Sequence, residues 1–189
     1  MGERADRPLV VAVVGSPRPT GNTSILVDAA LAELERRGAA VTKLMLCDYH
    51  IAPCLGHDTC GDLERCPQGD DVAEVLATVY AADGLLLATP VYYENVSAQM
   101  KAFIDRNLFQ YAHDIFLAPK VVGLLAVTAE TGLDDTLAAL RRFVALSTEG
   151  DVLVFSMGGF ADKAGAAAGD DELLEAARGL AADMAGALF

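Results

Sequence analysis

Residues 9–24 read LVVAVVGSPRPTGNTS, and this stretch decides the fold. Its first six residues are all apolar, which is typical of a parallel strand covered by helices on both faces. A loop of glycine, proline and hydroxyl residues follows. From Asn22 to Arg37 the apolar residues recur with the period of a helix, and Gly38 is a typical helix end. The stretch therefore predicts a strand–loop–helix unit of an α/β sheet.

The rest of the chain repeats this alternation. Further strands are expected at 41–46, 84–88, 121–127 and 151–155. Further helices are expected at 71–81, 97–110, 133–146 and 171–188. The pattern predicts a doubly wound, five-stranded parallel sheet with helices on both faces. Residues 1–189 are expected to form one domain, with a flexible start at 1–7 and an irregular, cysteine-containing insertion at 47–69.

The composition indicates a globular protein, because 53% of the residues are hydrophobic and 22% are charged. The formal charge is −13, so neither nucleic acid nor an anionic membrane is expected as a partner. The apolar runs are too short to span a membrane, and the polar start does not resemble a signal peptide. We therefore expect a cytoplasmic protein whose four cysteines are reduced thiols or metal ligands.

The loop at 15–24 is a candidate phosphate site, because a helix start presents unpaired amides and a partial positive charge. The side chains expected to bind there are Ser16, Arg18, Asn22, Thr23 and Ser24. The alternative is an ordinary helix start capped by one hydroxyl. A nucleotide-hydrolysing P-loop is excluded, because Asn22 replaces the lysine that it needs.

Two further loops, at 89–97 and 128–132, are expected at the same edge of the sheet and are candidates to hold a planar ring. Pro90 stiffens the first of them, and two tyrosine rings can pack against a ligand. The alternative is that both tyrosines are wedged under the loop. The candidate binding residues are Pro90, Val91, Tyr92, Tyr93 and Asn95, together with Thr128, Ala129 and Gly132.

Two motifs are similar to those of a known family. Gly-Ser-Pro-Arg at 15–18 with Gly-Asn-Thr-Ser at 21–24 resembles the FMN-phosphate loop of the NADPH-dependent FMN reductases. Pro-Val-Tyr at 90–92, with the helix that follows, resembles their isoalloxazine loop. The resemblance covers nearly the whole chain and implies a flavodoxin-like fold with strand order 2-1-3-4-5. It also implies FMN as cofactor, NAD(P)H as co-substrate, and assembly into a homodimer or homotetramer.

The cysteine-containing segment has the spacing C-x2-H-x2-C-x5-C, and its candidate metal ligands are Cys54, His57, Cys60 and Cys66. The segment resembles the cluster loop of the iron–sulfur flavoproteins, in which the position of His57 is a cysteine. Three thiolates and one imidazole also suit structural zinc. Three alternatives stay open: an iron–sulfur cluster, a zinc site, or ordinary thiols.

The activity that the resemblance implies is a two-step exchange, in which NAD(P)H reduces bound FMN and a small acceptor then takes the electrons. Candidate acceptors are quinones, nitro or azo compounds, metal ions and free flavin. No catalytic side chain is assigned, because the flavin carries the chemistry. The alternatives are an iron–sulfur flavoprotein that acts as an electron carrier and a non-catalytic flavin-binding module.

Overall fold

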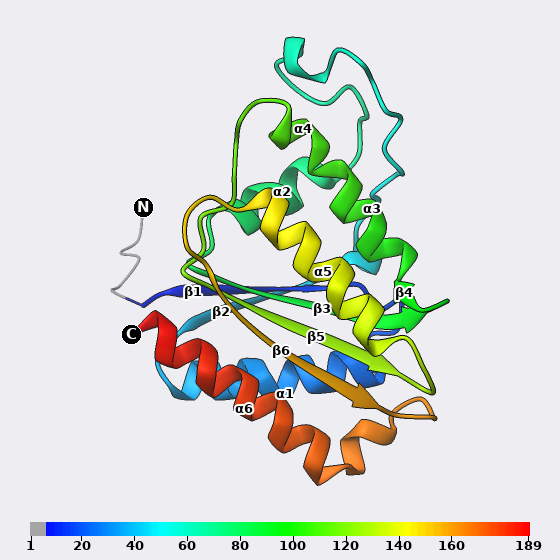
Figure 1. Ribbon diagram of the computed structural model, residues 1–189, viewed down its shortest axis with the longest axis vertical. Helices are drawn as coiled ribbons and strands as arrows, with labels where there is room; N and C mark the ends of the chain where they lie inside the picture. Colours follow the sequence, from blue (N-terminus) through cyan, green and yellow to red (C-terminus); the bar gives the residue numbers. More distant parts are fainter. Residues whose placement is uncertain (1–6) are drawn as a thin grey trace.

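The computed structural model describes residues 7–189 and is built around a parallel sheet (Figure 1). Its strands are β1 (Leu9–Val14), β2 (Ala40–Met45), β3 (Gly84–Tyr92), β4 (Asn95–Val96), β5 (Val121–Thr128) and β6 (Leu153–Phe160). Its helices are α1 (Asn22–Arg36), α2 (Val72–Tyr80), α3 (Ala98–Arg106), α4 (Leu108–Tyr111), α5 (Leu133–Ser147) and α6 (Asp171–Leu188). Short 3₁₀ turns are η1 (Leu46–Asp48), η2 (Cys60–Asp62) and η3 (Ala166–Gly169).

The long strands are hydrogen-bonded in the order β2-β1-β3-β5-β6, and every pair is parallel. The predicted fold class is confirmed. The order differs from the predicted one only through β4, a two-residue strand that the sequence did not indicate and that runs antiparallel to the end of β3. Because the long strands point the same way, their carboxyl ends meet at one edge of the sheet, on the right of Figure 1.

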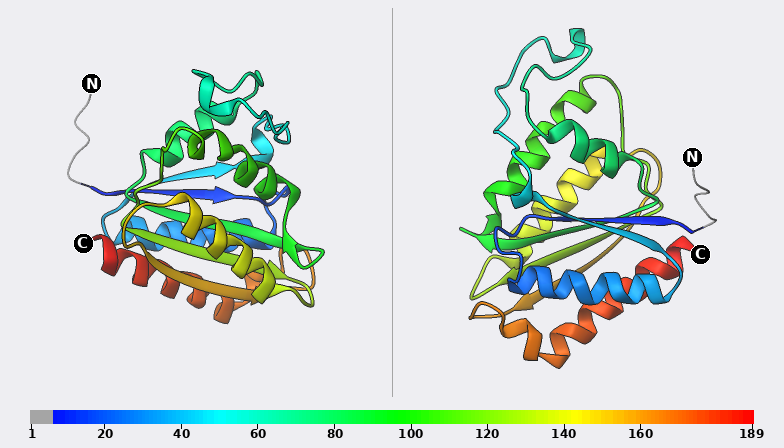
Figure 2. Two further views of the ribbon diagram at one scale, coloured as in Figure 1. Left: turned by 45° about the horizontal axis from the view of Figure 1, so that its top comes forward. Right: turned by 180° about the vertical axis from the view of Figure 1, so that it is seen from behind.

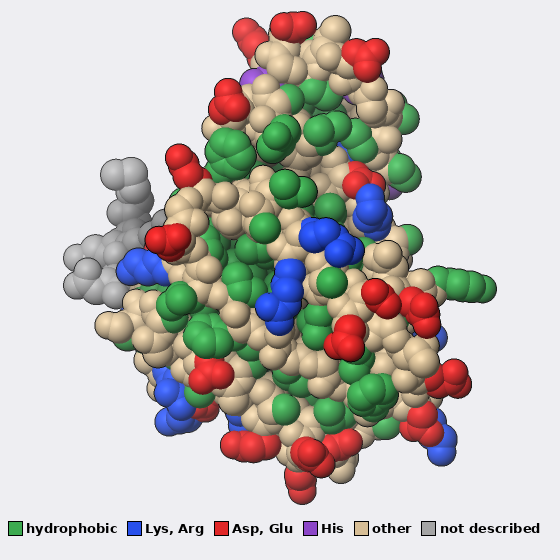
Figure 3. Space-filling view, in the orientation of Figure 1, with side chains coloured by type: hydrophobic (Ala, Val, Ile, Leu, Met, Phe, Trp, Pro, Cys, Tyr) green, Lys and Arg blue, Asp and Glu red, His purple; other side chains and the backbone are tan. Residues whose placement is uncertain are grey.

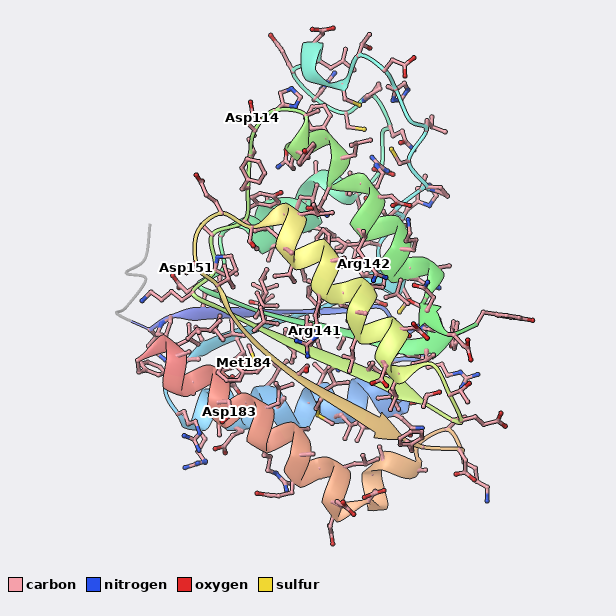
Figure 4. All side chains as sticks on the ribbon, in the orientation of Figure 1. Asp114, Arg141, Arg142, Asp151, Asp183 and Met184 are labelled. Atoms are coloured by element: carbon pink, nitrogen blue, oxygen red, sulfur yellow. The ribbon has the colours of Figure 1, made fainter. Side chains whose placement is uncertain are left out.

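Helices cover both faces of the sheet, with α1 and α6 on one face and α2, α3 and α5 on the other (Figures 1 and 2). In β1, Val10 and Ala12 pack toward the α1 and α6 layer, whereas Val11 packs toward the opposite layer. This alternation explains why the whole strand is apolar. Gly123 in β5 lets α6 approach closely, because a Cβ atom there would lie 2.4 Å from Sδ of Met184 (labelled in Figure 4).

Two strands extend beyond their predicted ends, which were residues 88 and 155. In β3, the pairing with β1 ends at Ala88, so the side of the strand that faced β1 is a free edge at Pro90. A proline is tolerated at such an edge, because its missing N–H leaves no hydrogen bond of the sheet unmade. In β6, Gly158 and Gly159 weakened the sequence pattern of a strand. A Cβ atom at these two positions would lie 3.0 Å from Leu133 and 2.9 Å from Leu173, so the glycines allow α5 and α6 to pack closely.

The helix predicted at 97–110 is divided into α3 and α4 at Asn107. The side-chain amide of Asn107 is buried and donates to the carbonyl oxygen of Phe103 at 2.8 Å. Such a bond from side chain to backbone competes with the helical pattern. The other helices begin and end close to their predicted bounds.

The cysteine segment, defined as residues 47–69, projects beyond α4 at the top of Figure 1. His113, which follows α4, contacts it: one ring nitrogen lies 2.8 Å from the carbonyl oxygen of Leu63. Residues 1–6 of the predicted flexible start lie outside the described residues, whereas Arg7 donates a hydrogen bond to the carbonyl oxygen of Gly38 at 2.8 Å. Over residues 7–189, none of the helices has the length and apolar character needed to cross a membrane.

Candidate functional site

A pocket of about 150 Å³ lies at the carboxyl edge of the sheet. The loop after β1, the end of β3, the loop after β5 and the loop after β6 all line it. Nine of the thirteen predicted positions of the first three loops meet there: Ser16, Arg18, Asn22, Thr23, Pro90, Val91, Tyr92, Thr128 and Ala129. The other predicted positions, which are not among the lining residues, are Ser24, Tyr93, Asn95 and Gly132.

The start of α1 is the anion-binding feature of this pocket. Gly21 precedes the helix, and no side chain caps it, so the alternative of a hydroxyl-capped helix start is wrong. Within the described part of the chain, the backbone N–H groups of Asn22, Thr23 and Ser24 donate to no acceptor. Free amides at the positive end of a helix dipole are a ready site for a phosphate or carboxylate.

The loop before this helix is held by its own hydrogen bonds. Oγ of Ser16 accepts from the backbone amide of Arg18 at 3.1 Å, and the Gly21 amide donates to the Arg18 carbonyl oxygen at 3.0 Å. Ser16 and Thr23 are buried, whereas Arg18 is exposed at the mouth of the pocket. These internal hydrogen bonds close the turn, and the Arg18 guanidinium lies at the same pocket as the start of α1.

Two side chains of the first loop have structural partners where we expected phosphate contacts. Oγ of Ser24 is fully buried and accepts from the Lys43 ammonium at 2.7 Å. The Asn22 amide donates to the carbonyl oxygen of Lys163 at 2.8 Å, and its oxygen accepts from the Ala167 amide at 3.2 Å. For Asn22 and Ser24, only the backbone amide is therefore free to meet an anion.

The end of β3 and β4 form a tight hairpin with Tyr93 and Glu94 at its tip. Both tip residues have positive φ, 49° and 57°, a conformation that usually selects Asn or Gly in a two-residue turn. Tyr93 is fully exposed and Tyr92 is 41% exposed, so neither ring is wedged beneath the loop. The hairpin thus presents an aromatic edge to solvent beside the pocket.

The loop after β5 packs against this hairpin. Oγ1 of Thr128 donates to the carbonyl oxygen of Thr131 at 2.6 Å, which closes the turn. Gly132 has φ +84°, and a Cβ atom there would lie 2.6 Å from Cα of Glu94. The role of Gly132 is therefore to let two loops meet.

Sequence reasoning missed Ser97, which joins the first two loops. Its buried hydroxyl donates to the carbonyl oxygen of Gly15 at 2.6 Å and accepts from the Met100 amide at 3.2 Å. Its backbone amide donates to Oγ1 of Thr89 at 3.0 Å. The available signal was a serine at the first position of the helix predicted at 97–110, because serine is a preferred N-cap residue and α3 in fact begins one residue later, at Ala98.

Sequence reasoning also missed the fourth loop, which contributes Ala161, Asp162, Lys163 and Ala164 to the pocket. The rule that ligands bind at the carboxyl ends of strands would have selected it if β6 had been predicted to reach Phe160.

The candidate metal ligands do not gather into a site. Cys60 is buried in η2, and the Cys54 sulfur accepts from the Gly56 amide at 3.4 Å. The Cys66 sulfur lies 3.3 Å from Nη2 of Arg106. Among residues 7–189, no group of three or more His, Cys, Asp or Glu side chains is placed to hold a metal ion, so the residues as arranged do not fit an iron–sulfur cluster or zinc.

A buried ion pair between Arg106 and Asp70 anchors the cysteine segment. Their side chains are 1% and 3% exposed. Arg106 also donates to the carbonyl oxygen of Ala52 at 3.0 Å, so it contacts both ends of the segment. Burial is the largest single influence and opposes both charges, but the hydrogen bonds that each group makes and the attraction between the charges together outweigh it. The pKa of Asp70 therefore lies below its usual value and the pKa of Arg106 lies above it.

A doubly wound sheet with free amides and an aromatic hairpin at its carboxyl edge defines the flavodoxin-like class of flavin-binding folds. Residues 8–163 match the model of the NADPH-dependent FMN reductases, and the chain belongs to this family.

Relatives and solved structures agree with this assignment. An iron–sulfur flavoprotein of Archaeoglobus fulgidus is 42% identical over 134 residues, which are 71% of this chain and 60% of that protein. This chain thus matches about three fifths of that relative's length. An iron–sulfur flavoprotein of Methanocaldococcus jannaschii is 38% identical over 141 residues, 71% of this chain and 70% of that protein. The apo form of an NADH:FMN oxidoreductase superposes with a TM-score of 0.69 at 23% identity, covering 96% of this chain and 90% of that one, and supports the fold.

Proposed function

We propose that the protein is an FMN-dependent oxidoreductase that passes electrons from NAD(P)H to a small acceptor. The observation that carries the proposal is the set of free amides at Asn22, Thr23 and Ser24. Asn22 and Thr23 line the pocket that the four loops share. These donors fit a phosphate group, and the family match supports FMN as its bearer. Bound FMN would supply the redox chemistry, accepting a hydride and releasing electrons.

The residues of the chain bind and orient the cofactor. The start of α1 and Arg18 would hold the phosphate, while the β3–β4 hairpin and the loop at 128–132 would flank the ring. Their turns are formed by internal hydrogen bonds, so little ordering has to accompany binding. The exposed tyrosines at the hairpin leave one side open for a nicotinamide and then for an acceptor such as a quinone, a nitro or azo compound, a metal ion or flavin.

We also propose that the working form is a homodimer or homotetramer. An open, mostly apolar groove of about 700 Å³ runs between α3, α4, α5 and the cysteine segment. Leu108, Tyr111 and Leu146 expose apolar side chains at this groove, and Figure 3 shows apolar side chains gathered over α4. A second copy of the chain would bury this surface. The charge of −13 supports the absence of nucleic acid and anionic membranes among the partners, and we propose a cytoplasmic location.

An electron carrier with an iron–sulfur cluster is the second candidate, because both relatives named above are iron–sulfur flavoproteins. The separated positions of Cys54, Cys60 and Cys66 do not support it. We therefore derive no electron transfer through this segment.

The test is anaerobic reduction of FMN-loaded protein by NADH and by NADPH, followed through the loss of the flavin absorbance bands. An oxidoreductase reduces its flavin at turnover rates with at least one nicotinamide, and added acceptor restores the bands. Tight FMN binding without reduction by either nicotinamide would instead make the protein a non-catalytic flavin-binding module and would overturn the proposed activity.

A further inference from the structure

The loop after β6 lies over the start of α1, at the phosphate end of the pocket (Figure 2). The Ala161 amide donates to the carbonyl oxygen of Thr128 at 2.8 Å, which attaches the loop to the third loop. The Ala166 amide donates to the carbonyl oxygen of Lys163 at 3.1 Å and tightens the turn. Backbone hydrogen bonds therefore fix where this loop crosses the pocket.

Asn22 attaches the same loop to the helix start. Its amide nitrogen donates to the carbonyl oxygens of Lys163 at 2.8 Å and Ala161 at 3.4 Å, and its oxygen accepts from the Ala167 amide at 3.2 Å. Asn22 therefore has two roles: its backbone amide is free at the pocket, and its side chain holds the fourth loop beside the pocket. The Asn22 side chain thereby sets the position of Lys163.

The positive charge at the pocket is smaller than the negative charge of a phosphate monoester. A phosphate monoester carries close to two negative charges at neutral pH, because its second pKa is about 6. Arg18 supplies one positive charge and the helix dipole about half of another, while Asp162, which also lines the pocket, opposes an anion. Lys163 lines the pocket as well, and within residues 7–189 its ammonium forms no ion pair or hydrogen bond.

We propose that Lys163 is the second cationic ligand of the FMN phosphate, positioned by Asn22, and that it makes the site select FMN over riboflavin. This inference rests on the proposed function. Lys163 acts as a point charge and needs no fixed geometry, whereas the guanidinium of Arg18 can form paired hydrogen bonds. Since riboflavin lacks the phosphate, the contribution of Lys163 is specific to FMN.

The experiment compares FMN and riboflavin affinities by quenching of flavin fluorescence at low ionic strength. We expect Lys163→Gln to weaken FMN binding by about two- to fivefold, because an exposed charge pair contributes at that level, and to leave riboflavin binding unchanged. Lys163→Arg retains FMN affinity, and Asp162→Asn increases it. Lys120→Gln is the matched control, because it removes the same charge beside the opposite end of β5 and leaves both affinities unchanged.

Asn22→Ala tests the positioning role. Asn22→Ala is expected to weaken FMN binding in the wild-type protein. In the Lys163→Gln variant the same substitution should cost less FMN affinity, because Asn22 acts through the contact of Lys163 with the phosphate. Additive losses would contradict the positioning role. Equal FMN affinity of wild type and Lys163→Gln, or an equal loss for riboflavin, would overturn the inference. Failure of the wild-type protein to bind FMN would instead overturn the proposed function, so the two failures are distinguishable.

Discussion

At Gly132 the chain needs a residue without a side chain, for two separable reasons. The backbone has φ +84°, which strains any L side chain, and a Cβ atom would lie 2.6 Å from Cα of Glu94. Gly150 has nearly the same φ, +81°, but its Cβ atom would meet nothing within 4 Å. A comparison of substitutions at Gly132 and Gly150 therefore separates the cost of backbone strain, present at both, from the cost of steric overlap between the hairpin and the third loop, present only at Gly132.

We predict that Gly150→Ala lowers the free energy of unfolding by about 1–2 kcal/mol, the cost of the left-handed conformation. Gly132→Ala is expected to lose about 1–3 kcal/mol more, because the hairpin has to move. Urea unfolding followed by circular dichroism measures both. Only Gly132→Ala should also weaken FMN binding, and equal losses of stability in the two variants would contradict the packing described here.

Single residues also show what sequence reasoning can reach. The first loop was located because a glycine and hydroxyl pattern follows an apolar strand, and that pattern is local. The side-chain partners of Asn22 and Ser24 could not be predicted, because they lie far away in sequence, at Lys163 and Lys43. A polar side chain at a helix start suits an anion or a distant carbonyl equally well, and only the fold decides between them.

Among the elements, the cysteine segment is attached to α3 through Arg106, which contacts Ala52 and Cys66 in the segment and forms a buried ion pair with Asp70 directly after it. Breaking a buried ion pair leaves an uncompensated charge, which costs about 3–5 kcal/mol. Asp105 on the same helix pairs with Lys101 at the surface and offers a matched control. An exposed pair of this kind contributes at most about 1 kcal/mol.

We predict that Asp70→Asn lowers the free energy of unfolding at pH 7 by about 3 kcal/mol, whereas Asp105→Asn changes it by less than about 1 kcal/mol. The pKa of Asp70 is lowered in the folded state, so its contribution is present above the unfolded value, about 3.9, and is lost as the pH falls through the folded pKa. The difference between wild type and Asp70→Asn should therefore shrink below pH 4. Urea midpoints between pH 3 and pH 7 measure it, and a difference that does not depend on pH would contradict this account.

The ends of elements were harder to predict than their existence. β6 was expected to stop at 155 but continues to Phe160, through two glycines that allow close packing of α5 and α6. That early stop concealed the fourth loop and with it Lys163. The metal ligands of the cysteine segment could not be decided from spacing, because spacing does not determine whether thiols converge in space.

At the scale of the whole molecule, the groove of about 700 Å³ between α3, α4 and α5 is an apolar feature that a single chain leaves uncovered. Arg142 also lines the groove and lies on α5, next to Arg141 (Figure 4). Leu146 at this groove is 69% exposed, and Leu153 at the start of β6, outside it, is 55% exposed.

We predict that the wild-type protein is a dimer or tetramer in size-exclusion chromatography with light scattering. Leu146→Glu should reduce the mass to that of one chain, because a carboxylate in an apolar interface is costly. Leu153→Glu should leave the mass unchanged. A monomeric wild type would contradict the proposed assembly, as would a Leu146→Glu variant that keeps the wild-type mass.

The inference on which the proposed function depends is that this fold holds FMN at the carboxyl edge of its sheet. The most direct measurement is an ultraviolet–visible spectrum of protein purified without oxygen, with flavin, iron and zinc quantified on the same sample. We predict flavin absorbance bands, about one FMN per chain after loading, and iron and zinc far below one per chain. A colourless protein that takes up no FMN would contradict the flavin site, and a broad brown absorbance with stoichiometric iron would contradict the description of the cysteine segment.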